Sequence, residues 1–261
     1  MSDNKPVRCF EGTAKPYERF WTFKNVAGPG GVADGAVELE LYGVISEYSW
    51  LGDEITPQLF KSDLTVKGQG RPVTVRINSY GGDIIAASLI RAFLMDYPGE
   101  VTARIDGVAA SAAVAVALAA KNILIQDTAY MMIHNPYLVY MGALDETNLR
   151  LYADEVATLK AGIVDTYAAR TGMSAAKIST MMDNETWMSA KEAVKFGFAD
   201  QVITATKADN SGINRAQNMA FINALRNFDN VPAALLESVQ PDLEPSDAER
   251  YLRDEIYFLR R

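Results

Sequence analysis

Residues 101–120 read VTARIDGVAASAAVAVALAA and combine two patterns that decide the fold. Residues 101–105 are rich in β-branched side chains and predict a strand. Residues 107–120 are small and aliphatic and predict a buried core helix that starts near Ala110. The run is too short to span a membrane, which takes a helix of about 20 residues. A strand that leads directly into a buried helix is typical of a parallel sheet covered by helices.

The same alternation continues on both sides of this stretch. Further strands are expected at residues 37–45, 73–78, 122–126, 130–133 and 200–204. A turn at residues 79–83 opens a helix at 84–97, and another helix is expected at 56–64 with Thr56 as its N-cap. A long helix is expected at 144–170, a shorter one after Ser174, and a last one that begins at the capping box SAKE, residues 189–192. The pattern predicts an α/β domain.

The two ends of the chain differ from this region. Residues 1–35 are rich in aromatic side chains and end in a glycine-rich loop, so we expect an irregular N-terminal arm. Residues 207–212 read KADNSG and predict a linker. Two short amphipathic segments follow, at residues 215–228 and 246–260. We therefore divide the chain into an arm (1–35), an α/β domain (36–206) and a helical C-terminal extension (207–261).

Charge and cysteine content exclude several classes of function. The net charge is -8, from 25 basic and 33 acidic residues, which argues against nucleic-acid binding. The single cysteine, Cys9, excludes an intramolecular disulfide and a cysteine-rich metal site, and it fits a reducing compartment. The first residues lack the apolar stretch of a secretion signal. We expect no cofactor, no metal ion and no membrane partner.

Ser111 is the first candidate for chemistry, because it lies just past a predicted strand and at the start of a predicted helix. Open α/β sheets collect their sites beyond the carboxyl ends of the strands. The unpaired amides of a helix N-terminus can stabilise a developing oxyanion. The small neighbours of Ser111 let a peptide approach its hydroxyl. The alternative is that Ser111 is merely a small residue in a small-residue core.

The chain has one histidine, His134, in the segment MIHNP at residues 132–136. An imidazole is the usual proton acceptor for a serine nucleophile near neutral pH, so a serine–histidine mechanism has a single possible base here. A structural histidine is the alternative. Gly81 and Gly82 follow another strand, and their amides can point into a shared crevice. If these strands are neighbours, the glycines, Ser111 and His134 meet at one edge of the sheet.

A triad also needs a carboxylate that orients the imidazole. The segment MMDNETW at residues 181–187 supplies the two main candidates, Asp183 and Glu185, and Asp165 and Asp154 are weaker ones. The residues alone leave this choice open.

Four segments resemble, in order and spacing, the proteolytic subunit of Clp proteases: NSYGG at 78–82, GVAAS at 107–111, MIHNP at 132–136 and SAKEAVKFGFAD at 189–200. The resemblance covers residues 37–204. It implies the ClpP/crotonase-like superfold, in which helices cover a stacked parallel-sheet core. Residues 144–170 then resemble the long handle helix that interleaves between rings, and a homo-oligomeric ring is expected.

The same resemblance implies a serine peptidase with Ser111 as nucleophile, His134 as general base and Asp183 as acid. The amides of Gly81 and Ala112 would form the oxyanion hole. The chain departs from the family at three positions: Tyr80 stands where Pro is usual, Ala112 where Met is common, and Met181 falls at the acid position unless the alignment shifts locally by two residues.

A narrower resemblance is to the Clp-like prohead proteases of tailed bacteriophages, carried by Phe20-Trp21, LYGVI at 41–45, SWLGDEIT at 49–56 and ETWMSA at 185–190. It implies cleavage of scaffold and capsid proteins in the host cytoplasm or inside the prohead, with an extension that self-cleavage can remove. Three alternatives stay open: a housekeeping Clp core fed by an ATPase, an inactive scaffold or shell protein of the same fold, and an acyl-CoA hydratase or isomerase.

Overall fold

The structure is a computed structural model that describes residues 21–25, 37–45, 57–140, 142–204, 228, 230–233 and 235. The chain divides into two compact units, residues 1–230 and 231–261, and the sheet and the candidate site belong to the first. The domain limits drawn from the sequence stay predictions. Four expected features lie outside the described residues: Cys9, the glycine-rich loop, the Thr56 cap and, except for Phe228, the two amphipathic segments.

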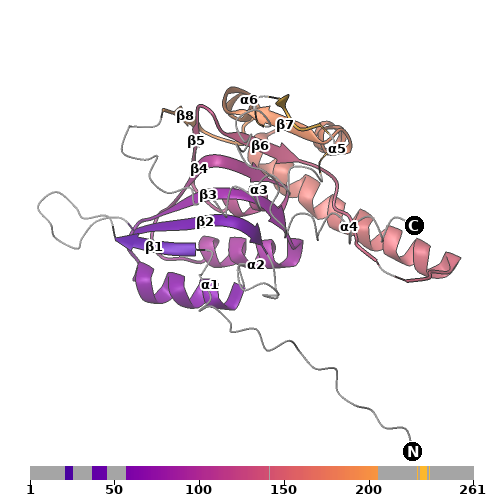
Figure 1. Cartoon of the computed structure of the whole chain (residues 1–261), viewed down its shortest axis with the longest axis horizontal. Coiled ribbons are helices and arrows are strands. Elements are labelled where there is room, and N and C mark those ends of the chain that lie inside the picture. Colours follow the sequence, from indigo (N-terminus) through magenta and orange to yellow (C-terminus); the bar gives the residue numbers. More distant parts are fainter. Residues whose placement is uncertain are drawn as a thin grey trace, which may run out of the picture. The chain divides into compact units, whose positions relative to one another are not determined.

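Within the described residues, eight strands form one sheet (Figure 1). Along its main path the order is β1-β2-β3-β4-β5-β8, while β6 pairs with β4 and β7. Their bounds are β1 (Trp21–Asn25), β2 (Val37–Ile45), β3 (Val73–Gly82), β4 (Val101–Ala110), β5 (Asn122–Gln126), β6 (Tyr130–Ile133), β7 (Thr186–Ser189) and β8 (Gln201–Ile203). All pairs are parallel except β1–β2 and β6–β7. The predicted parallel α/β core is confirmed.

The helices are α1 (Pro57–Asp63), α2 (Ile84–Met95), α3 (Ala112–Ala117), α4 (Glu146–Thr171), α5 (Ala175–Asp183) and α6 (Ala190–Lys195), and a π-helical turn (Leu64–Gly68) extends α1. Two predicted caps are present: the Ser174 hydroxyl accepts the Lys177 N–H, and Ser189 and Glu192 form the capping box. The long helix α4 projects away from the sheet (Figure 1). In the described part of the chain, no helix has both the length and the apolar character needed to cross a bilayer.

The two faces of the central strands differ in chemistry. Along β3, Val73, Val75 and Ile77 are buried in the core, while Arg76 lies on the opposite face. There the Asp106 carboxylate accepts hydrogen bonds from Tyr42 Oη at 2.6 Å, Arg76 Nε at 2.6 Å and Arg104 Nε at 2.9 Å. The Asp106 side chain is only 13% exposed. This network connects β2, β3 and β4, the strands that lead to the candidate site.

The structure corrects three predictions. Residues 107–110, where the strand is expected to end and a helix to start, continue β4, and α3 covers only Ala112–Ala117. The reason is tertiary: β6 pairs with this part of β4, with Val108 opposite Tyr130 and Ala110 opposite Met132. The expected turn at 79–83 is strand up to Gly82, because β2 pairs with β3 through that residue. Within the expected irregular arm, Trp21–Asn25 form β1 on the outer edge of β2.

Candidate active site

The segments predicted to carry chemistry lie at neighbouring strand ends. β4 pairs in parallel with both β3 and β6, so the carboxyl ends of these three strands are adjacent. Gly81 lies near the end of β3, Ser111 directly follows β4, and His134 directly follows β6. The Ser111 N–H donates to the Met132 carbonyl oxygen at 2.8 Å. This bond holds Ser111 against the strand that carries the histidine.

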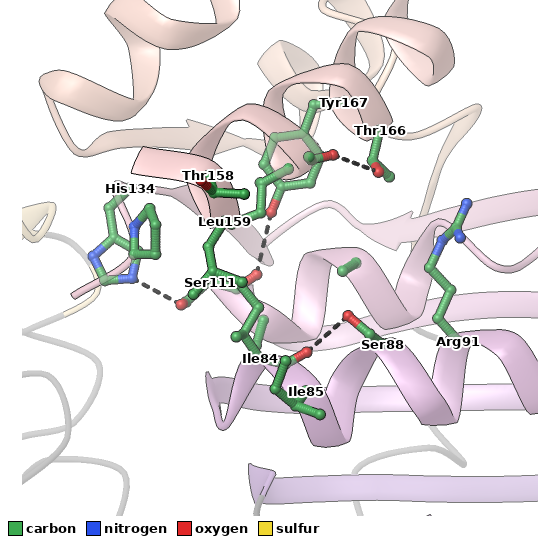
Figure 2. A pocket seen from close by; sticks show the side chains of 15 residues that line it. Ile84, Ile85, Ser88, Arg91, Ser111, His134, Thr158, Leu159, Thr166 and Tyr167 are labelled. Atoms are coloured by element: carbon green, nitrogen blue, oxygen red, sulfur yellow. Dashed lines mark hydrogen bonds between the residues drawn. The ribbon is translucent and has the colours of Figure 1, made fainter. Parts of the chain in front are cut away.

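The hydroxyl of Ser111 lies against the imidazole. His134 Nε2 is 2.7 Å from Ser111 Oγ, which is hydrogen-bond distance (Figure 2). Ser111 is the N-cap of α3, yet its side chain makes no capping bond to the helix. Its backbone has φ 54° and ψ -126°, a strained conformation for a residue other than glycine. The strained turn therefore directs the hydroxyl to His134 instead of the helix amides.

The surroundings of His134 favour its neutral form. Burial lowers the pKa of the imidazole below its ordinary value, and the negative charge of Glu185 acts in the opposite direction. The rings of Tyr137 and Phe228 pack edge-on against it, with centroids at 5.8 and 5.7 Å. A neutral imidazole is the form that can accept a proton from a serine hydroxyl.

Gly81 and Ala112 bring two backbone amides next to Ser111. Gly81 has a φ of 90°, and a Cβ there would lie 2.7 Å from Ala112 N and 2.7 Å from the Ala110 carbonyl oxygen. Ala112 is the first residue of α3, where helix amides lack a partner within the helix. The Gly81 N–H donates to Ser79 Oγ at 3.1 Å. Only glycine fits at position 81 without displacing the backbone beside Ser111.

Asp183, the predicted acid, lies at the end of α5 with a half-exposed side chain. Its Oδ1 accepts hydrogen bonds from Lys160 Nζ at 2.5 Å and from Asn135 Nδ2 at 2.9 Å. These two bonds, that from Lys160 above all, lower the pKa of the Asp183 carboxyl. Asp183 thus contacts Asn135, which follows His134, and forms an ion pair with Lys160 of α4.

Glu185, the other main candidate, acts on the imidazole itself through its charge. It has a φ of 45°, which is unusual for a residue other than glycine. Its Oε1 accepts hydrogen bonds from Trp187 Nε1 at 3.1 Å and from the Asn230 N–H at 2.9 Å. The weaker candidates Asp154 and Asp165 lie exposed on α4.

A cavity of about 320 Å³ opens beside Ser111 and His134. Figure 2 shows it between α2 and α4, with Ser111 and His134 at one end and Arg91 at the other. Its walls are mostly apolar, and the side chains that line it include Ile84, Ile85, Leu159 and Ile163. Among the described residues, Arg91 is the one arginine or lysine that lines the cavity, and no acidic residue does. Within the same part of the chain, Arg91 Nε is buried and has no hydrogen-bond partner.

Sequence reasoning did not find Arg91, Tyr167 or Phe228. Tyr167 Oη lies 3.5 Å from the Ser111 carbonyl oxygen, and its pKa is raised by burial. These residues join the site through the packing of α2, α4 and the segment after β8, for which the sequence carries no local signal. Within the described ranges, no group of three His, Cys, Asp or Glu side chains is placed to bind a metal ion.

Comparisons with known proteins identify the family and the fold of the chain. The family model described as Clp protease matches residues 47–206. The ATP-dependent Clp protease proteolytic subunit 1 of Protochlamydia amoebophila is 31% identical over 154 residues, 58% of this chain and 74% of that protein. Its counterpart in Chlamydia muridarum is 32% identical over 152 residues, 58% of this chain and 78% of the other. A ClpP1 mutant from Listeria monocytogenes has the same fold, with a TM-score of 0.55 and 24% identity over 69% of this chain and 93% of its own.

Proposed function

Because the chain belongs to the Clp protease family, a family of serine peptidases, we propose that it is an endopeptidase with Ser111 as nucleophile and His134 as general base. The observation that carries this proposal is the 2.7 Å contact between His134 Nε2 and Ser111 Oγ. A nucleophile and base within hydrogen-bond reach, with the base largely neutral, are what acyl transfer requires.

In this mechanism His134 Nε2 accepts the proton of Ser111 Oγ while the oxygen attacks the scissile carbonyl carbon. The carbonyl oxygen becomes an oxyanion and accepts hydrogen bonds from the Ala112 and Gly81 amides, replacing Ser79 Oγ at the Gly81 amide. His134 then donates its proton to the leaving amine. A water molecule, deprotonated by His134, hydrolyses the acyl-enzyme and restores Ser111.

We assign the acid role to Asp183, because it holds Asn135, the residue next to His134, by a 2.9 Å hydrogen bond. Glu185 is the alternative, since its charge raises the pKa of His134. The variants Asp183→Asn and Glu185→Gln separate the two. If Asp183 orients the imidazole, Asp183→Asn loses far more kcat than Glu185→Gln, and the reverse order would assign the role to Glu185.

The first test is labelling of Ser111 with a serine-directed fluorophosphonate. The unchanged protein is expected to be labelled, and Ser111→Ala is expected to keep its circular dichroism spectrum while losing both the label and peptide hydrolysis. Equal labelling of the two proteins would refute the assignment. A fully unlabelled, folded wild type would support the inactive scaffold instead.

For the biological substrate, we propose the scaffold and capsid proteins of a phage prohead, processed in the host cytoplasm or inside the prohead. The support is the similarity of residues 49–56 and 185–190 to Clp-like prohead proteases. A housekeeping Clp core is the second candidate, because the similar bacterial proteins are named as ATP-dependent Clp proteolytic subunits.

Coexpression with the capsid and scaffold genes, followed by mass spectrometry, discriminates between these roles. Prohead processing predicts cleaved capsid or scaffold protein with the wild type and intact protein with Ser111→Ala. The same spectra report self-cleavage of the extension. Degradation of a tagged substrate only in the presence of a Clp ATPase, with the capsid proteins left intact, would favour the housekeeping role.

We also propose that the chain forms a homo-oligomeric ring through the segment before α4 and the start of that helix. Several large apolar side chains are exposed there in the single chain: Tyr137, Leu138, Val139, Tyr140, Leu149 and Leu151. Exposed apolar groups of this extent favour association. Sedimentation analysis is expected to show an oligomer that Leu149→Glu weakens.

A further inference from the structure

Phe228, in the segment after the last strand of the sheet, lies directly against the candidate base. Its ring packs edge-on against His134 and against Trp187, with both centroid distances at 5.7 Å. A third contact, tilted and at 6.3 Å, joins it to Tyr80. Tyr80 belongs to the end of β3, His134 follows β6, and Trp187 lies in β7. Three separate strands thus supply the partners of one aromatic side chain.

The chain beside Phe228 is also held through polar groups. The main-chain N–H of Asn230 donates to Glu185 Oε1 at 2.9 Å. Asn230 Nδ2 donates to the Asn184 carbonyl oxygen at 3.2 Å. Glu185 Oε1 in turn accepts the indole N–H of Trp187, which fixes one wall of the aromatic cluster. A pocket for a side chain combined with a hydrogen bond to the main chain beside it is a recurring feature of peptide recognition.

This cluster is distinct from the cavity between α2 and α4. His134 lines that cavity, whereas Tyr80, Trp187 and Glu185 do not. The imidazole of His134 therefore borders both the cavity and the aromatic cluster. The cavity beside Ser111 is open, and the aromatic cluster is filled by this chain's own Phe228.

We propose that Tyr80, His134 and Trp187 form a second binding site, for an aromatic side chain of a polypeptide, and that Phe228 occupies it in cis. The inference rests on the proposed function, since a peptide bound there lies next to the catalytic base. Contacts with three rings, two of them edge-to-face, select aromatic over aliphatic side chains. A polypeptide substrate with such a residue and Phe228 exclude each other.

Occupation in cis makes the extension a built-in competitor. A segment tethered to its own site has an effective concentration of order millimolar, so a free peptide at micromolar concentration competes poorly with it. Loss of the Phe228 ring is therefore expected to strengthen binding of a free peptide by about tenfold or more. The same change lowers the KM of aromatic polypeptide substrates.

The experiment measures binding of a synthetic peptide with the sequence of residues 224–232, ALRNFDNVP, by calorimetry. The full chain carries Ser111→Ala in every sample, so that hydrolysis plays no part. Phe228→Ala is expected to bind the peptide about tenfold or more tightly than the parent does. A second variant, Asn230→Pro, removes the N–H bonded to Glu185 and is expected to open the site as well.

Two controls make the result specific. The peptide with alanine in place of its phenylalanine is expected to bind Phe228→Ala weakly. Phe93→Ala removes a ring of α2 that lies against Lys61, and its affinity is expected to match that of the parent. Equal binding to the parent and to both opening variants, or equal binding of the two peptides, would overturn the proposal. Binding as expected, together with no peptide hydrolysis by the chain that keeps Ser111, would refute the proposed function alone.

Discussion

Replacing Gly81 by alanine is the sharpest test of the proposed oxyanion hole. Gly81 has a φ of 90°, and the added Cβ would lie 2.7 Å from Ala112 N, 2.7 Å from the Ala110 carbonyl oxygen and 2.9 Å from Ser111 Cβ. All three atoms belong to the turn that holds the nucleophile. The backbone of this turn must therefore move, and the amides of residues 81 and 112 no longer converge on one point.

The magnitude follows from two separate effects. An alanine with positive φ costs about 1–2 kcal/mol of folding free energy. Loss of one oxyanion donor lowers kcat by about 10²–10³-fold, or about 2.7–4 kcal/mol of transition-state stabilisation. Gly81→Ala is expected to show both effects, with a modest loss of stability and a large loss of kcat.

Gly172→Ala is the matched control. Gly172 has a φ of 72°, close to that of Gly81, but a Cβ there meets no atom within 4 Å. It is the C-cap of α4, outside the proposed catalytic groups. Gly172→Ala is expected to lose about 1–2 kcal/mol of stability and no kcat. Urea denaturation and hydrolysis of a fluorogenic peptide measure the two quantities. If folded Gly81→Ala cleaves as fast as Gly172→Ala, the oxyanion assignment is wrong.

Three further predictions concern the base, the cavity and the fold. Burial lowers the pKa of His134 below 6.5, and the base acts when it is neutral, so kcat/KM should rise with pH through a midpoint below 6.5. Glu185→Gln removes a negative charge that raises this pKa, so the variant's midpoint should lie lower still. We expect the wild type to prefer peptides that place a glutamate in the cavity over peptides that place a leucine there, and Arg91→Leu should reduce this preference by about tenfold. Unchanged selectivity in a competition assay between the two peptides would contradict a role for Arg91. Asp106→Ala should lower the free energy of unfolding by about 1.5–3 kcal/mol, because it removes the carboxylate that accepts hydrogen bonds from the largely buried Arg76 and Arg104. Glu146→Ala, which breaks an exposed ion pair, should change it by less than about 1 kcal/mol, and equal losses in urea would contradict the reasoning.

Local sequence patterns were sufficient to predict the helices where the sequence has a clear hydrophobic period or a capping motif. The long helix α4 begins and ends within two residues of the predicted limits, 144–170. The Ser189–Glu192 capping box is present because its two hydrogen bonds need only four consecutive residues. The small residues 107–110 carry no such period. They suit a helix or a strand equally, and pairing with β6 makes them strand.

Local sequence also could not choose the acid of the triad, although both main candidates lie in one short segment. Asp183 and Glu185 are two residues apart, and both carry a carboxylate. Their surroundings differ. Lys160 of α4 binds the Asp183 carboxylate, whereas Glu185 has a positive φ and its carboxylate accepts a hydrogen bond from the indole of Trp187. Lys160 lies outside the segment, and neither the positive φ at Glu185 nor the orientation of the Trp187 indole can be read from its residue types.

By itself, the sequence determined which chemical groups this protein has and in what order strands, turns and helices present them, because those features depend on neighbouring residues. One serine and one histidine after predicted strands, with a glycine pair after a third, made a serine–histidine site possible, and the resemblance of their segments to Clp proteases implied a serine peptidase. Only the tertiary structure decided what surrounds that chemistry: Arg91 at the far end of the cavity and Phe228 on the imidazole. Their contacts join residues far apart in the chain, and packing between distant elements leaves no mark on local periodicity.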